Sequence, residues 1–222
     1  MAEKHLPAGR LVAVDGSRGK DVSAAADALA ADLRRRGVDC VISRWDASGL
    51  FGELAQGGRP GQHVSPRTLS LMYAADLAFR LRWEINAALN TGGVVIAAPY
   101  LETAIAFGAA CGLPDTWLRE LLRFAPAPHV RGLARERKIE RGWKARLDRG
   151  YPEYATALFE GGAHGFRGRR ARKAMIAALD ADQGKKVFEL TAKGIEEAAK
   201  AVINSRPAGL SRSASRPRTA RR

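Results

Sequence analysis

The residues best suited to handling phosphate lie in one short segment, Asp15-Gly-Ser-Arg-Gly-Lys20. An apolar run precedes this segment, and an alanine-rich stretch with helical spacing follows it from Val22. A glycine-containing turn between a strand and a helix can hold anionic oxygens with backbone N–H groups, and a lysine adds a point charge. The candidate phosphate-binding residues are therefore Asp15, Gly16, Ser17, Gly19 and Lys20.

This segment departs from the phosphate-loop pattern G-x-x-x-x-G-K-[ST]. Counting back from Gly19, the position of the first glycine holds Val14 unless the loop is two residues shorter. The position whose hydroxyl would hold magnesium is Asp21. Taken alone, these residues fit a basic turn without phosphate chemistry as well as they fit a phosphate loop.

The elements that would position this segment follow an α/β order. Short apolar runs at 10–16 and 39–44 flank the helical stretch 22–36, which predicts a β-α-β unit with a parallel sheet. Ser65 and Pro66 suit the start of a helix that reaches about Leu89. The remaining predicted elements are strands at 94–98 and 185–190 and helices at 115–124 and 194–202. The fold class is therefore α/β, with a parallel sheet flanked by helices.

Length and composition indicate one globular domain. Of 222 residues, 46% are hydrophobic and 27% are charged, and we expect a domain over residues 1–204. Cys40 and Cys111 lie in apolar stretches, outside any metal-binding or redox spacing, so we expect buried free thiols. No apolar segment reaches the roughly 18 residues of a membrane span. We expect a cytoplasmic protein without a membrane partner.

The net charge of +14 is unevenly distributed along the chain. Residues 205–222 hold six arginines and no acidic residue, and we expect this tail to be disordered. Further basic clusters lie at 131–149 and 167–173. Weak, non-specific binding of nucleic acid through the tail is one expectation. Aromatic residues make up only 7% of the chain and do not alternate with the tail arginines, so base stacking has little support.

Several longer motifs resemble those of thymidylate kinases. Residues 65–76, SPRTLSLMYAAD, are similar to the family's helix motif S-P-x-T-x-x-L-L-Y-A-A-D-R, and residues 94–108 resemble its strand and helix V-V-I-C-D-R-Y-x-x-S-x-x-A-Y. Ser43-Arg44 with Gly52-Glu53 resembles the family's T-R-E-P-G-G-T-P-x-G-E loop, and residues 188–197 resemble its closing strand and helix. The resemblance covers about 10–124 and, more loosely, 185–203.

This resemblance implies a phosphate-loop nucleotide kinase fold with a lid. It also implies transfer of the γ-phosphoryl group of ATP to dTMP with Mg²⁺, and a homodimer that pairs through the helix 66–89. The basic segment of about 131–173 would be the lid-like insertion, although a solvated helical face is the alternative interpretation of its first part. The residues carried over to the monophosphate and base pocket are Arg44, Tyr73, Tyr100 and Phe107.

Family positions that carry charge, a metal-binding hydroxyl or the first glycine of the phosphate loop are changed in this chain. Besides Val14 and Asp21, the D-R pair of the second motif is Ala98-Pro99, and the arginine after A-A-D is Leu77. Because phosphoryl transfer depends on positioning and charge stabilisation, these losses favour a nucleotide-binding protein with weak or lost transfer and weak binding of ATP and Mg²⁺. An active, divergent nucleoside-monophosphate kinase that uses the basic lid is the alternative. A basic nucleic-acid-binding module is a third hypothesis.

Overall fold

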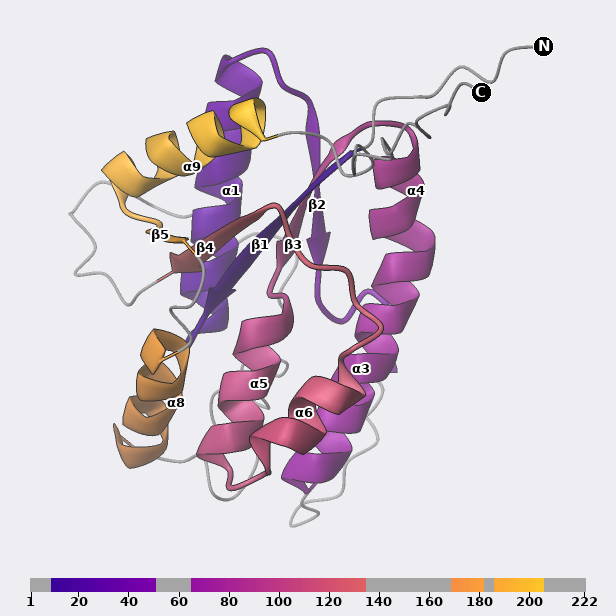
Figure 1. Ribbon diagram of the computed structural model, residues 1–222, viewed down its shortest axis with the longest axis vertical. Helices are drawn as coiled ribbons and strands as arrows, with labels where there is room; N and C mark the ends of the chain where they lie inside the picture. The colour runs from indigo at the N-terminus through magenta and orange to yellow at the C-terminus, as the bar shows by residue number, and fades with distance from the viewer. Residues whose placement is uncertain (1–8, 51–64, 135–168, 182–185, 206–222) are drawn as a thin grey trace, which may run out of the picture.

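The computed structural model describes residues 9–50, 65–134, 169–181 and 186–205, with side chains for all of these except 169–172. Five parallel strands form one sheet in the order β2-β3-β1-β4-β5 (Figure 1). The strands are β1 (Arg10–Gly16), β2 (Cys40–Arg44), β3 (Val94–Ala98), β4 (Val130–Ala134) and β5 (Val187–Glu189). The predicted α/β fold class is confirmed.

Helices cover both faces of the sheet (Figure 1). Along β1, Leu11 and Ala13 point to one hydrophobic cluster, whereas Val12 and Val14 point to the other, as the alternation of a strand requires. The second cluster is covered by α1 (Gly19–Arg35) and α9 (Ala192–Asn204). The first is covered by α3 (Pro66–Arg80), η1 (Leu81–Ile85), α4 (Asn86–Asn90), α5 (Leu101–Ala110), α6 (Asp115–Leu121) and α8 (Arg169–Ala181).

The long helix predicted from Ser65 is present, with a change of geometry in its middle. Ser65 caps it by accepting a hydrogen bond from the backbone N–H of Thr68 (3.1 Å), and Pro66 follows in the first turn. One turn of π-helix, η1, separates α3 from α4. The helical run ends before Gly92, whose φ of 81° is a conformation that favours glycine.

Strand β4 forms although its sequence, with Arg131 and Gly132, is poor in strand-forming residues. It is an inner strand that pairs with β1 on one side and β5 on the other. Gly132 leaves room for Leu190, because a Cβ there would lie 2.7 Å from the Leu190 Cδ1 atom. The guanidinium of Arg131 reaches Glu102 at 2.9 Å. Packing and one ion pair therefore offset the weak local preference for a strand.

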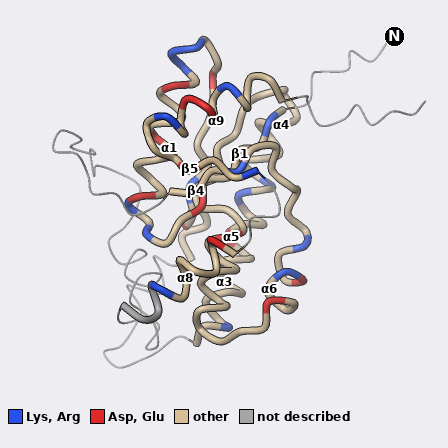
Figure 2. The backbone as a smooth tube through the Cα atoms, turned by 60° about the vertical axis from the view of Figure 1, so that its left-hand side comes forward, with Lys and Arg blue, Asp and Glu red and all other residues tan. Residues whose placement is uncertain are grey.

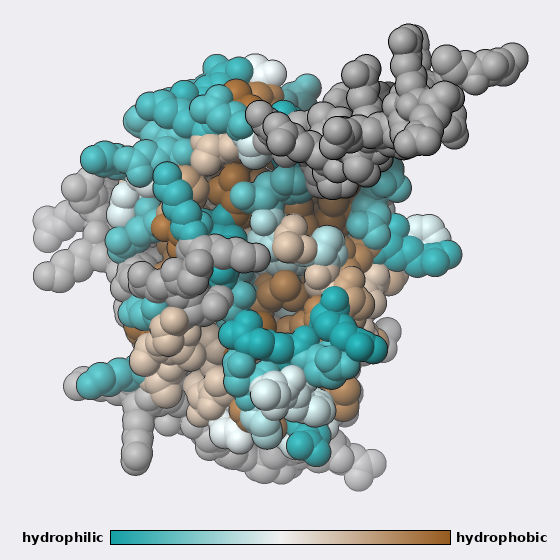
Figure 3. Space-filling view, viewed as in Figure 1, coloured by the Kyte–Doolittle hydropathy of each residue, from teal (hydrophilic) through white to brown (hydrophobic). Residues whose placement is uncertain are grey.

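The segment expected to form a basic lid at about 131–173 lies mostly outside the described residues. Its first four residues complete β4, and its last five lie in α8, where Met175 and Leu179 face the core. The tail 205–222 lies outside the described residues after Ser205. In the described part, Lys and Arg are interspersed with Asp and Glu along the outer helices (Figure 2). Hydrophilic residues cover the upper end of α1 and α9 (Figure 3).

The two cysteines are free thiols. Cys40 is buried and Cys111 is half-buried. Burial raises the pKa of the Cys40 thiol, and it raises the pKa of Cys111 to about 11. Within the described ranges, no helix has the length and apolar character needed to cross a bilayer.

Candidate functional site

The predicted phosphate-binding segment is very short. Two residues, Ser17 and Arg18, connect β1 to α1, and Ser17 is buried. Gly16 donates its N–H to the hydroxyl of Thr103 (3.1 Å), and a Cβ at this glycine would lie only 2.6 Å from the carbonyl oxygen of Ala134. The end of β4 therefore lies close beside the end of β1, at the place where a longer loop would fold around phosphate oxygens.

Charge at the start of α1 also differs from that of a phosphate site. The carboxylate of Asp21 lies in the first turn, 3.6 Å from the Nε atom of Arg18, and both side chains are largely enclosed. Lys20 is exposed at the second position of the helix. A carboxylate in the first turn interacts favourably with the helix dipole but repels an incoming phosphate. Lys20 remains as the predicted cationic contact.

Asp15 connects β1 to the start of α5. Its Oδ1 atom accepts hydrogen bonds from the backbone N–H of Tyr100 (2.9 Å), the backbone N–H of Thr103 (3.0 Å) and the Thr103 hydroxyl (2.7 Å). Burial raises the pKa of the Asp15 carboxyl, while these hydrogen bonds and the charge of Arg131 act in the opposite direction. The N-cap residue of α5, Tyr100, makes no side-chain capping bond, so Asp15 caps this helix from another element.

Arg44, predicted to hold a monophosphate, is directed at α1. Its guanidinium donates to the Ser23 hydroxyl (2.7 Å) and to the carboxylate of Asp27 (2.6 Å). The Asp27 side chain is 54% exposed, so this ion pair lies at the surface. Binding of a phosphate by Arg44 would have to compete with Asp27.

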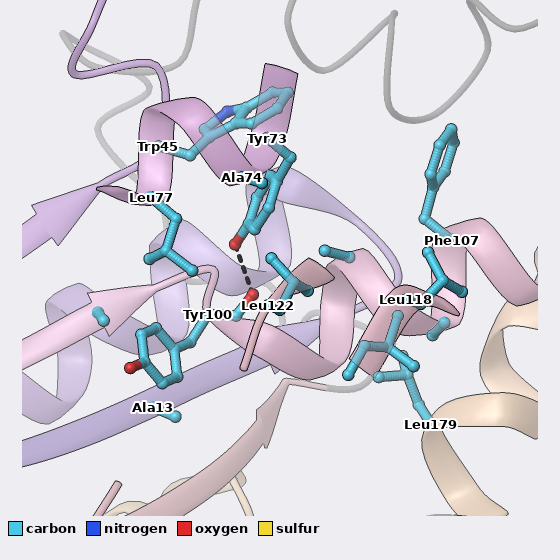
Figure 4. Close-up of a cluster of buried hydrophobic side chains, with 14 of the residues drawn as sticks. Ala13, Trp45, Tyr73, Ala74, Leu77, Tyr100, Phe107, Leu118, Leu122 and Leu179 are labelled. Atoms are coloured by element: carbon cyan, nitrogen blue, oxygen red, sulfur yellow. Dashed lines mark hydrogen bonds between the residues drawn. The ribbon is translucent and has the colours of Figure 1, made fainter. Parts of the chain in front are cut away.

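The three predicted pocket aromatics lie in the hydrophobic core (Figure 4). Tyr73 and Tyr100 have no exposed surface, and Phe107 is 1% exposed. The Tyr73 hydroxyl donates to the carbonyl oxygen of Tyr100, and the Tyr100 hydroxyl donates to that of Pro126 (2.8 Å). Trp45 packs near Tyr73, with ring centroids 6.2 Å apart. In this arrangement the aromatic rings support the core.

Asp76, in the helix motif, organises the turn after β2. Its carboxylate is fully buried and accepts hydrogen bonds from the backbone N–H groups of Asp46 (3.0 Å) and Ser48 (2.9 Å) and from the Ser48 hydroxyl (2.9 Å). Asp46 has a φ of 58°, a left-handed conformation that these contacts help to hold. The sequence motif contained this residue, but its role as an acceptor for the turn depends on the tertiary structure.

Arg80, a charged residue at the end of α3, was not among the predicted site residues. This residue has no exposed surface, and it contacts the ends of both β2 and β3. A signal for its burial exists in the sequence, because Arg80 follows Leu69, Tyr73 and Leu77 at helical spacing on the buried face.

The described residues offer few groups that could hold ATP with magnesium. A two-residue connection leaves little backbone to surround a triphosphate, and the magnesium hydroxyl is replaced by Asp21. Within the described ranges, no three His, Cys, Asp or Glu side chains are grouped to hold a metal ion.

The chain is similar in sequence to proteins named thymidylate kinase. No protein-family model matches the chain. The chain is 31% identical over 128 residues to a probable thymidylate kinase of Thermococcus onnurineus. This match covers 54% of this chain and 62% of that relative. The chain is also 31% identical over 130 residues to a thymidylate kinase of Xylella fastidiosa, and 34% identical over 130 residues to one of Xanthomonas oryzae. The Xylella match covers 59% of this chain and 60% of that relative. The Xanthomonas match covers 56% of this chain and 55% of that relative.

The chain thus spans about three fifths of the length of these curated relatives. The resemblance predicted from the motifs is confirmed: over a little more than half of its length, this chain is similar to proteins named thymidylate kinase.

Proposed function

We propose that this chain is a thymidylate-kinase-like protein that binds a nucleotide and has weak or lost transfer of phosphate from ATP to dTMP. The observation that supports weak or lost transfer is the two-residue connection between β1 and α1, with the carboxylate of Asp21 in the first turn of the helix. Homology to thymidylate kinases supports a nucleotide as the ligand class. ATP is expected to bind weakly, chiefly through Lys20.

A coupled assay of ADP release tests this proposal, using ATP, Mg²⁺ and dTMP, dUMP or dCMP. Kinases turn over roughly 1 to 100 times per second, and we expect a rate far below that range. Loss of one pre-placed electrostatic donor commonly costs about a hundredfold to a thousandfold, and this chain has lost several. Equilibrium binding of dTMP, measured in parallel, should be detectable.

Lys20→Ala is the critical variant, and Lys193→Ala is its matched control. Each lysine is the exposed second residue of a helix, α1 or α9. Turnover near one per second that Lys20→Ala abolishes and Lys193→Ala leaves intact would establish the alternative, an active kinase whose basic segment supplies the missing charge. Nucleic-acid binding with a steep salt dependence and no nucleotide binding would instead favour the third hypothesis.

We also propose that two copies pair through the helix 66–89. Supporting this, Leu71, Phe79 and Trp83 on that helical run are 49%, 40% and 61% exposed and recur at spacings of eight and four residues. Light scattering should report a dimer that Trp83→Asp weakens. A monomer at micromolar concentration would exclude this pairing.

A further inference from the structure

Arg80 is a buried cation bound to the ends of two strands. Its Nε atom donates to the Ser43 hydroxyl (3.0 Å), and its Nη2 atom donates to the carbonyl oxygens of Ser43 (2.8 Å) and Pro99 (3.0 Å). The side chain has no exposed surface. Its Nη1 atom is buried and has no acceptor among the described residues. One nitrogen of the guanidinium therefore has unused hydrogen-bonding capacity.

The charge of this guanidinium is not matched by a direct ion pair. Within the described part of the chain, no carboxylate lies within 4 Å of Arg80. The nearest compensation runs through Ser43, whose hydroxyl donates to the Glu84 carboxylate (2.6 Å). A buried charge is costly when it lacks direct pairing and complete hydrogen bonding. Such a guanidinium is suited to bind an anion that supplies the opposite charge and the missing hydrogen-bond acceptor.

Arg80 lies at the carboxyl ends of two parallel strands. Ser43 is the penultimate residue of β2, and Pro99 directly follows β3. Ligands of open parallel sheets bind outside the carboxyl ends of the strands. The π-helical turn η1 begins at the residue after Arg80, and such turns are frequent at functional sites.

Neighbouring groups do not supply the missing negative charge. Burial raises the pKa of the Tyr100 phenol, while the charge of Arg80 acts in the opposite direction. The hydroxyl therefore stays protonated, and it donates to Pro126. Asp15, which is also close enough to act on Tyr100, directs its Oδ1 atom at the start of α5.

We propose that Arg80 binds an oxyanion through Nη1 at the carboxyl ends of β2 and β3. Resting on the proposed function, the oxyanion is the phosphate group of a nucleoside monophosphate. Arginine matches phosphate oxygens with its planar fork, and a charge-assisted hydrogen bond of this kind is short and strong. Because Arg80 is enclosed, neighbouring side chains must separate as the phosphate enters, and binding is coupled to that opening.

Titration calorimetry at fixed ionic strength tests the site with three probes: dTMP, thymidine and inorganic phosphate. Arg80→Met should weaken dTMP binding by about tenfold or more while leaving thymidine binding unchanged, because only dTMP carries the oxyanion. Arg80→Lys should also weaken dTMP binding, since one ammonium lacks the planar fork of the guanidinium. Arg82→Met, an exposed arginine on the same helical run, should change neither affinity more than twofold.

The possible outcomes distinguish failure of the Arg80 site from failure of the proposed function. Nucleotide binding that Arg80→Met leaves unchanged, or an equal loss for dTMP and thymidine, overturns the site and leaves the proposed function standing. Arg80-dependent binding of inorganic phosphate without nucleotide binding supports the site and overturns the proposed function. If Arg80→Met does not fold, a crystal structure of the unchanged chain with dTMP decides. A phosphate oxygen at Nη1 supports the site, and an ordered water alone at that nitrogen overturns it.

Discussion

Replacing Asp15 tests whether its main role is to cap α5. Asp15→Ala removes the acceptor of two buried backbone donors, the N–H groups of Tyr100 and Thr103, and of the Thr103 hydroxyl. Each buried donor left without a partner costs about 1 to 3 kcal/mol, so the two N–H groups together should lower the free energy of unfolding by about 4 kcal/mol. For a domain of this size, that corresponds to a fall in Tm of roughly 8 to 16 °C.

Asp15→Asn should lose much less stability, because its amide oxygen can accept the same hydrogen bonds. Asp27→Ala is the matched control, since it removes a carboxylate whose ion pair with Arg44 is at the surface and should cost less than about 1 kcal/mol. Urea unfolding of the three variants gives the free energies. A cost of less than about 1 kcal/mol for Asp15→Ala would refute the capping role, as would equal losses for the Ala and Asn variants at position 15.

The raised pKa of the Asp15 carboxyl also predicts how the folding stability changes with pH. Its pKa is raised in the folded chain, so the folded state holds the proton at pH values where the unfolded chain, with a pKa of about 3.9, has released it. The contribution of Asp15 to the free energy of unfolding is therefore largest below about pH 4, and it declines as the pH rises through the raised pKa. Asp15→Asn lacks this titration. Its stability relative to the unchanged chain should improve with rising pH, and a constant difference from pH 3 to 8 would contradict the assignment.

Three further changes have defined outcomes. Gly194→Ala should destabilise the chain by about 1 to 3 kcal/mol in urea unfolding, because the new Cβ would lie 1.7 Å from the carbonyl oxygen of Glu189; unchanged stability would contradict that packing. Ala98→Asp with Pro99→Arg should lower Tm without restoring turnover near one per second, because both positions are buried; rapid turnover would show that these were the decisive losses. Deleting residues 205–222 should leave Tm within a few degrees by calorimetry, because that segment has few apolar side chains; a larger fall would show that the tail supports the fold.

Local sequence signals determined most of the secondary structure. The hydroxyl of Ser65 before Pro66 predicted the start of α3, and the apolar run 94–98 predicted the strand β3, which is buried along its whole length. These signals work because hydrogen-bond capping and hydrophobic burial along one element depend on residues a few positions apart. The motif in 65–76 likewise indicated the resemblance to thymidylate kinases, because its side chains occur together in one helix.

Contacts between distant segments were decided only by the tertiary structure. Strand β4 forms because β1 and β5 pair with it, although its own residues favour a strand weakly. Asp15 caps a helix that begins 86 residues later in the chain, and Arg80 is buried because Ser43 and Pro99 offer it carbonyl oxygens. The sequence shows which hydrogen bonds a side chain is able to donate or accept. Which partner it meets depends on how the crossovers of the parallel sheet bring strand ends together, and that is set by the packing of the whole domain.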